Sequence, residues 1–170
     1  YGTGLSGWQG PSGGRDGCLQ RLRYTGDPVL MVESFSVVEG GVELKFSFDV
    51  DPATVRDKSA WRVQMWNYLW SRVYGSEQWS ILQPGRIGRD DLEVEDVFLI
   101  EPDKVRLVLP ELTMCDQLFI DMNFKTAETP GGISRFVEQL YATIHHLPNQ
   151  APVENRTIPK KSETAEAGTP

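Results

Sequence analysis

The chain has 170 residues, of which 39% are hydrophobic and 24% charged, so a packed core is expected and wholesale disorder is not. Its formal net charge of -7 argues against a general binder of nucleic acid or anionic membranes, because both need concentrated Lys and Arg. Uninterrupted apolar runs are short, so no segment is expected to span a bilayer.

The first 28 residues differ from the rest of the chain. Residues 1–17 are rich in Gly and contain Trp8, which indicates a loop that feeds a strand. The run CLQRLRY then alternates like a strand from Cys18 to Tyr24, and the turn residues GDP end it. The sequence therefore predicts a boundary after residue 28.

The next segments follow a β pattern with period two. Between residues 41 and 49 one face of the predicted strand is apolar and the other polar, which demands one buried and one wet face. Residues 34–38 and the turn Glu39-Gly40-Gly41 complete a hairpin with this strand. Asp51 as an N-cap and Pro52 after it predict a single helical turn before the next strand.

The second half of the predicted domain consists of further strands and one long loop. A strand begins at Trp61 and runs into WNYLW, and residues 76–91 form an excursion loop containing Pro84 and Gly85. Four more strands are predicted at 92–100, 104–109, 117–124 and 138–144. After Pro148 the composition turns to Pro, Glu, Lys, Thr and Ala, so residues 149–170 are predicted to be a disordered tail or linker.

Seven or so short strands without a long amphipathic helix predict an all-β fold, an Ig-like antiparallel β-sandwich over residues 29–148. The residues expected between its two sheets are Val42, Leu44, Phe46, Phe48, Val63, Val105, Leu107, Leu118 and Ile120. Trp8 has no obvious place in this core. Residues 1–28 are therefore expected to lie against the sandwich, with Trp8 near the WNYLW strand.

No set of residues predicts catalysis. The adjacent His145 and His146 would face opposite sides of a strand, so they cannot readily share a metal ion. Ser71 and Ser76 lack the GxSxG turn that a serine nucleophile requires. The chain is therefore expected not to be an enzyme, and to carry no metal site and no cofactor.

The acidic pairs and the two cysteines have structural interpretations. Asp90 and Asp91, like Asp49 and Asp51, are expected to cap loops, because the spacing of a calcium-binding loop is missing. Cys18 and Cys115 stand far apart and outside any CxxC, so two separate thiols are expected, while a disulfide in an oxidising compartment is left open.

The unusual local feature is the density of aromatic residues between positions 61 and 79. If Trp61 and Met65 face the core, then Trp66, Tyr68 and Trp70 share the opposite face of the sheet. We expect these rings to be covered by the 76–91 loop or by a neighbouring domain. The alternative is a carbohydrate-binding surface made by Trp66, Tyr68, Trp70 and Trp79, since sugar faces stack on indole rings.

Two stretches resemble known families. The stretch LKFSFDVDPATVRDKSAWRV looks like bacterial Ig-like domains with an acidic turn after the second strand. The segments GLSGWQ, RDGCLQRLRYTG, WNYLW, GRDDLEV, VRLVLPEL and YATIHHLP together resemble the C-terminal region of secreted bacterial haem-binding or "membrane-bound dehydrogenase" proteins. This second resemblance covers roughly residues 4–148.

The resemblance implies a particular molecular setting. In that family a glucose/sorbosone dehydrogenase-like β-propeller precedes the module and cytochrome-type segments occur nearby, so residues 1–28 would be the last strand and exit loop of a propeller blade. The family's haem-attachment motif CxxCH is absent here, and Cys18 stands where a small residue is expected. The implied function is a non-catalytic accessory domain, periplasmic or extracellular, whose partners are the propeller and cytochrome-type domains of the same parent protein.

Overall fold

The computed structural model describes residues 2–3, 19–26, 29–72, 74–128 and 132–148. The chain divides into two compact units, residues 1–30 and residues 31–170, and each is described by itself. Among the described residues, no helix has the length and apolar character needed to cross a membrane.

In the N-terminal unit, β1 (Gly2–Thr3) pairs antiparallel with β2 (Leu19–Gln20). The predicted strand is shorter than expected, because residues 21–26 lie outside it with exposed side chains. Trp8 and Cys18 are outside the described residues, as is the 149–170 segment. The packing of Trp8 on the sandwich and the origin of this unit in a propeller blade stay predictions.

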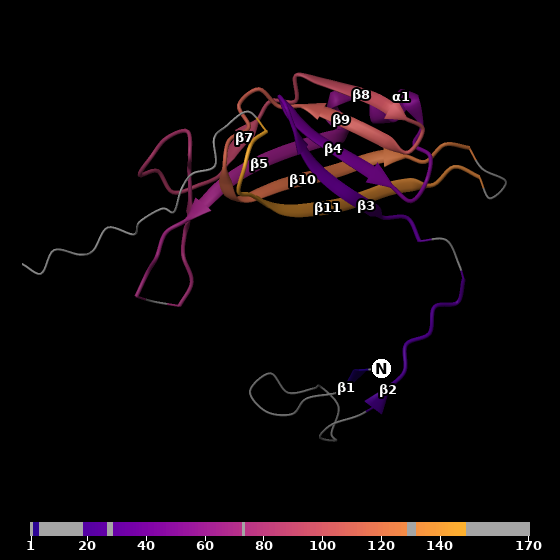
Figure 1. Ribbon diagram of the computed structural model, residues 1–170, viewed down its shortest axis with the longest axis horizontal. Coiled ribbons are helices and arrows are strands. Elements are labelled where there is room, and N and C mark those ends of the chain that lie inside the picture. The colour runs from indigo at the N-terminus through magenta and orange to yellow at the C-terminus, as the bar shows by residue number, and fades with distance from the viewer. Residues whose placement is uncertain (1, 4–18, 27–28, 73, 129–131, 149–170) are drawn as a thin grey trace, which may run out of the picture. The chain divides into compact units, whose positions relative to one another are not determined.

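The first sheet of the second unit is antiparallel with the order β3-β4-β9-β8 (Figure 1). Its strands are β3 (Val32–Val38), β4 (Gly41–Phe46), β8 (Asp96–Glu101) and β9 (Lys104–Val108). The predicted hairpin is confirmed, with Leu44 and Phe46 buried and Glu43 on the other face. Gly41 is required where β4 meets β9, because a Cβ there would lie 1.9 Å from the Leu107 carbonyl oxygen.

A short helical segment carries the chain from this sheet to the other. It consists of α1 (Pro52–Val55) and the 3₁₀ helix η1 (Lys58–Ala60). The predicted cap of α1 is confirmed, since the Asp51 carboxylate accepts hydrogen bonds from the backbone N–H groups of Ala53 and Thr54 at 3.3 Å. The buried Trp61 donates from Nε1 to the Val55 carbonyl oxygen at 2.8 Å, which fastens α1 to the next strand.

The second sheet has the order β11-β10-β5-β6, and β7 also pairs with β5. Its strands are β5 (Trp61–Tyr68), β6 (Gln78–Trp79), β7 (Asp90–Leu92), β10 (Cys115–Lys125) and β11 (Arg135–Ile144). The prediction of one strand over 92–100 is wrong. The chain pairs as β7 in this sheet, crosses at residues 93–95 with Val94 buried, and pairs as β8 in the other sheet.

The two sheets pack face to face around one apolar core, and the all-β sandwich is confirmed. Every residue of the predicted core is buried except Phe48, which is half-buried and packs against Phe46 and Phe136 with ring centroids 5.5 and 4.9 Å away. The seven main strands, in chain order, are β3, β4, β5, β8, β9, β10 and β11. Numbered one to seven in that order, they lie side by side as 1-2-5-4 in the first sheet and as 7-6-3 in the second sheet. This is the strand order of an immunoglobulin-type sandwich.

Candidate functional site

The four aromatic residues singled out in the sequence differ sharply in exposure. Trp66 is 1% exposed, Tyr68 43% and Trp70 86%, while Trp79 is half-buried. Trp66 lies outside the core cluster between the sheets, as the alternation predicted, but its face of β5 is covered. Trp66 therefore does not lie on an open sheet surface. The expected cover by the 76–91 segment is found for Trp66, whereas Tyr68 and Trp70 are exposed.

The cover over Trp66 is Arg89, which the sequence analysis did not single out. Its guanidinium carbon lies 4.2 Å from the centroid of the Trp66 ring and 5.8 Å from that of Phe119. Arg89 also donates from Nε to Gln78 Oε1 at 2.8 Å and from Nη1 to Gln64 Oε1 at 3.2 Å. The planar cation thus stacks on the indole while its N–H groups stay hydrogen-bonded.

Asp90, next to Arg89, organises the loop that supplies this cover. Its buried carboxylate accepts hydrogen bonds from Ser80 Oγ at 2.5 Å and from the backbone N–H groups of Ile81 and Leu82 at 2.6 and 3.0 Å. Arg86 Nη2 donates to it at 3.1 Å. Burial by itself raises the pKa of Asp90, but these hydrogen bonds outweigh burial and lower the pKa below its ordinary value. The predicted loop-capping role of Asp90 is confirmed.

Two successive hairpins connect β5 to Asp90. In the first, β6 returns against the end of β5, pairing Asn67 with Trp79 and Tyr68 with Gln78. In the second, Trp79 forms an isolated bridge with Ile87, and the N–H of Gly88 donates to the Gln78 carbonyl oxygen at 2.8 Å. Trp79 is therefore held from both sides by backbone pairing.

Asp116 of β10 fixes the end of β5 at the base of the first hairpin. Asp116 Oδ2 accepts a hydrogen bond from the Tyr68 N–H at 2.9 Å, and the Asp116 N–H donates to Asn67 Oδ1 at 2.8 Å. Further out, Ser76 Oγ accepts from the Leu69 N–H at 3.0 Å and donates to the Glu77 carbonyl oxygen at 2.8 Å. The hydrogen bond between Leu69 and Ser76, together with the pairing of β5 with β6, joins the two arms of the hairpin.

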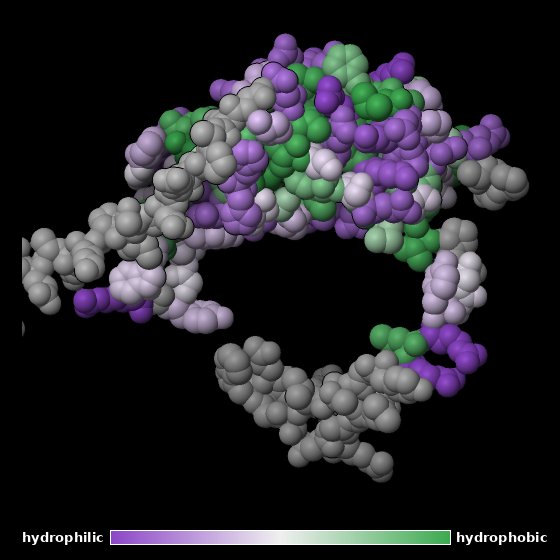
Figure 2. Space-filling view, viewed as in Figure 1, coloured by the Kyte–Doolittle hydropathy of each residue, from purple (hydrophilic) through white to green (hydrophobic). Residues whose placement is uncertain are grey.

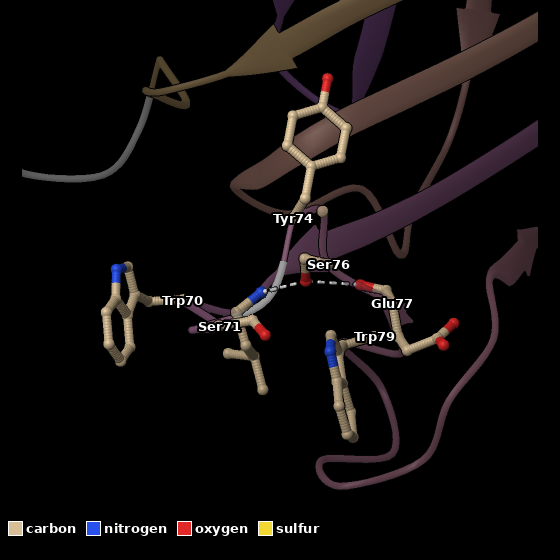
Figure 3. A pocket seen from close by; sticks show the side chains of 8 residues that line it. Trp70, Ser71, Tyr74, Ser76, Glu77 and Trp79 are labelled. Carbon is tan, nitrogen blue, oxygen red and sulfur yellow. Dashed lines mark hydrogen bonds between the residues drawn. The ribbon is translucent and has the colours of Figure 1, made fainter.

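Between the arms lies a hollow of about 460 Å³ (Figure 3). Its lining residues are Leu69, Trp70, Ser71, Tyr74, Gly75, Ser76, Glu77 and Trp79. Figure 3 shows the indoles of Trp70 and Trp79 on its two sides, with the Tyr74 ring directed away from both. Of the four predicted residues, the hollow thus brings together Trp70 and Trp79, whereas Tyr68 is not in its lining and packs edge-on against Trp66 at 6.5 Å.

The remaining reactive side chains do not converge. His145 and His146 follow the end of β11 and are exposed. Cys115 is a free, buried thiol in β10, and burial raises its pKa to about 11. Within the described ranges, no group of three or more His, Cys, Asp or Glu side chains is placed to hold a metal ion.

Comparisons of the chain with protein-family models, with curated proteins and with solved structures give no match. The strand order gives the fold class, which is an immunoglobulin-type β-sandwich. An aromatic-rich hairpin, in which β6 folds back on β5, follows β5.

Proposed function

We propose that the chain is a non-catalytic Ig-like accessory module of a larger secreted protein, serving to pack against or space its neighbouring domains. The immunoglobulin-type strand order supports the module. The sequence resemblance supplies the setting: a propeller similar to sugar dehydrogenases, cytochrome-type segments, and a periplasmic or extracellular location.

The observation that carries the proposal is the use of the chain's ionisable groups. The pKa values of Asp51 and Asp57 are lowered first by hydrogen bonds from the hydroxyls of Thr54 and Ser59, which belong to helix caps. The pKa of Glu43 is lowered first by its hydrogen bond from Lys104, 2.8 Å away on the outer face of a sheet. Perturbed carboxyls in an active site usually serve catalysis, whereas each of these is used to hold a turn or strand in place.

The edges of the sandwich support a role in packing. The edge strands β3 and β11 carry Phe35, Val37 and Leu140, which contact the core but are half-buried. On β11, Val137 and Tyr141 are 60% and 53% exposed. Figure 2 shows apolar side chains reaching an otherwise largely hydrophilic surface. A neighbouring domain seated on an edge would remove this apolar area from water.

The experiment has two arms. The purified full chain should show no haem spectrum after incubation with haem and no dye-linked oxidation of sugars, and activity in either assay would overturn the non-catalytic part. The reading frame upstream of Tyr1 should encode a propeller, and that domain should slow amide exchange in β3 or β11. An unrelated upstream frame would remove the proposed setting.

The second candidate function is carbohydrate binding. The hollow between Trp70 and Trp79 favours it, because both tryptophans line it together with the polar residues Ser71 and Ser76. The buried Trp66 is no longer part of this hypothesis, and Tyr68 lies beside the hollow.

A further inference from the structure

We propose that the hollow between Trp70 and Trp79 binds one sugar unit of a neutral polysaccharide, held by stacking on the indole rings. This inference rests on the second candidate function and is independent of the packing role. It replaces a flat platform on the sheet with a hollow built by the β5–β6 hairpin.

The ring geometry favours a sugar. The axial C–H groups of a pyranose form an apolar face that stacks on indole, while its hydroxyls require hydrogen-bond partners around the rim. The hollow offers Trp70 and Trp79 on its two sides and Ser71 in its lining, while Figure 3 shows the Glu77 carboxylate beyond Trp79, at the outer edge. A volume of about 460 Å³ falls within the range of small-ligand sites, roughly 300–1,000 Å³.

The Trp79 wall of the hollow is held in place before any ligand arrives. Trp79 is fixed by pairing with Asn67 on one side and Ile87 on the other. The Ile87 side of this arrangement is anchored in turn by the buried carboxylate of Asp90. A rigid wall lowers the entropy cost of binding, because the ring does not have to be ordered by the ligand.

Charge points to neutral glycans over acidic ones. The chain has a formal net charge of -7, and the acidic residue that lines the hollow is Glu77. A uronic acid or a sulfated sugar would bring a further negative charge to this site without a cation in the lining.

A protein partner fits the hollow less well. Stable protein interfaces bury about 800 Å² on each side around an apolar centre. Among the described residues of the hairpin, the exposed large apolar side chains are Tyr68, Leu69, Trp70 and Tyr74, and the polar Ser71 and Arg72 interrupt them. A projecting tip of this kind suits a chain of sugar units better than a flat protein surface.

Tryptophan emission of the full chain, titrated with soluble neutral glucans, mannan and xylan, tests the proposal, with polygalacturonate as the acidic comparison. At least one neutral polymer should shift the emission, and polygalacturonate should not. Trp70→Ala should weaken that binding roughly tenfold or more, because its exposed indole supplies stacking. Phe98→Ala is the matched control, since Phe98 is a 48% exposed aromatic residue on the other sheet and should leave binding unchanged.

Each contrary outcome has its own meaning. If no neutral polymer shifts the emission, both the hollow and the carbohydrate function are overturned. If a polymer binds equally well to Trp70→Ala, the carbohydrate function survives and the hollow is wrong. If no polymer binds and Trp70→Ala instead abolishes self-association in sedimentation, the hairpin is a protein interface and the proposal fails.

Discussion

The outer faces of the two sheets differ in how their side chains are kept compatible with water. On the β3-β4-β9-β8 sheet, Glu43 pairs with Lys104 at 2.8 Å and Arg106 at 3.1 Å, so charged side chains lie next to water. On the β11-β10-β5 sheet, Trp66 and Phe119 would be exposed if Arg89 and its loop did not cover them. A charged face needs no cover, whereas an apolar face depends on a loop whose own anchor is buried.

The largest effect is expected from Asp90→Ala, which removes the carboxylate that accepts four hydrogen bonds. Their donors are the Ser80 hydroxyl, the backbone N–H groups of Ile81 and Leu82, and the Arg86 guanidinium. Leaving buried donors unpaired should lower the free energy of unfolding by about 2–4 kcal/mol. Chemical denaturation measures the loss, and a red shift of tryptophan emission should report uncovering of Trp66. Glu93→Ala is the control, because Glu93 is an exposed acidic residue three positions further along the chain. Equal losses in the two variants would contradict the anchoring role of Asp90.

Arg89→Ala should have the next largest effect, about 1–2 kcal/mol, because the stacked guanidinium covers Trp66 and bonds Gln64 and Gln78. Arg89→Lys keeps the charge but loses the planar fork, so it should restore only part of the stability. Both variants are compared by thermal unfolding and tryptophan emission. Full rescue by Lys would mean that charge alone, without stacking, holds the loop.

Acid should weaken the covered face through Asp90. Its pKa is lower in the folded chain than in the unfolded one, so the carboxylate stabilises the fold above its unfolded pKa of about 4. That contribution is lost as pH falls from there through the folded pKa. Between neutral pH and about pH 3, the free energy of unfolding should therefore decrease more steeply for the wild type than for Asp90→Asn. Parallel pH profiles would show that another acid governs the loss.

The charged face should give the smallest change. Glu43→Gln is expected to cost about 1 kcal/mol at low salt and less at high salt, because partly exposed ion pairs are weak and screened. The control is Lys45→Ala, whose contacts with Glu33 and Asp103 are longer, at 3.9 and 3.7 Å. Its unfolding free energy should change less than that of Glu43→Gln, and the reverse order would refute the ranking.

The sequence predicts the sandwich because its strands alternate strictly. Val42, Leu44 and Phe46 with polar residues between them determine which face of β4 is buried, and Asp51 followed by Pro52 marks α1. The crossing at residues 93–95 was missed. In LEVEDV the alternation holds for Leu92 and Val94 and then slips by one residue at Glu95-Asp96, so that Val97 is the next buried side chain; a single slip of this kind is easily read as part of one continuous strand.

The site was harder to predict than the fold. Alternation placed Trp66 and Tyr68 on the correct face of β5, but exposure depends on what a loop lays over that face. Arg89 and Asp90 follow a glycine in a polar stretch, where residue type alone does not distinguish a solvated pair from a stacked cation and a buried anchor. The placement of Trp70 and Trp79 in the lining of one hollow likewise arises from a hairpin whose register is not encoded in a periodic pattern.

The buried thiol of Cys115 is a built-in reporter of how often this end of the sandwich opens to solvent. Burial raises its pKa to about 11, so near neutral pH its reactive thiolate fraction is roughly two orders of magnitude smaller than that of a free cysteine. Alkylation of Cys115 must therefore wait for β10 to open toward water near its pairing with Ile144 on β11. In a Cys18→Ser background, the rate at which the Cys115 thiol is alkylated would measure how often β10 and β11 separate at that end of the sandwich.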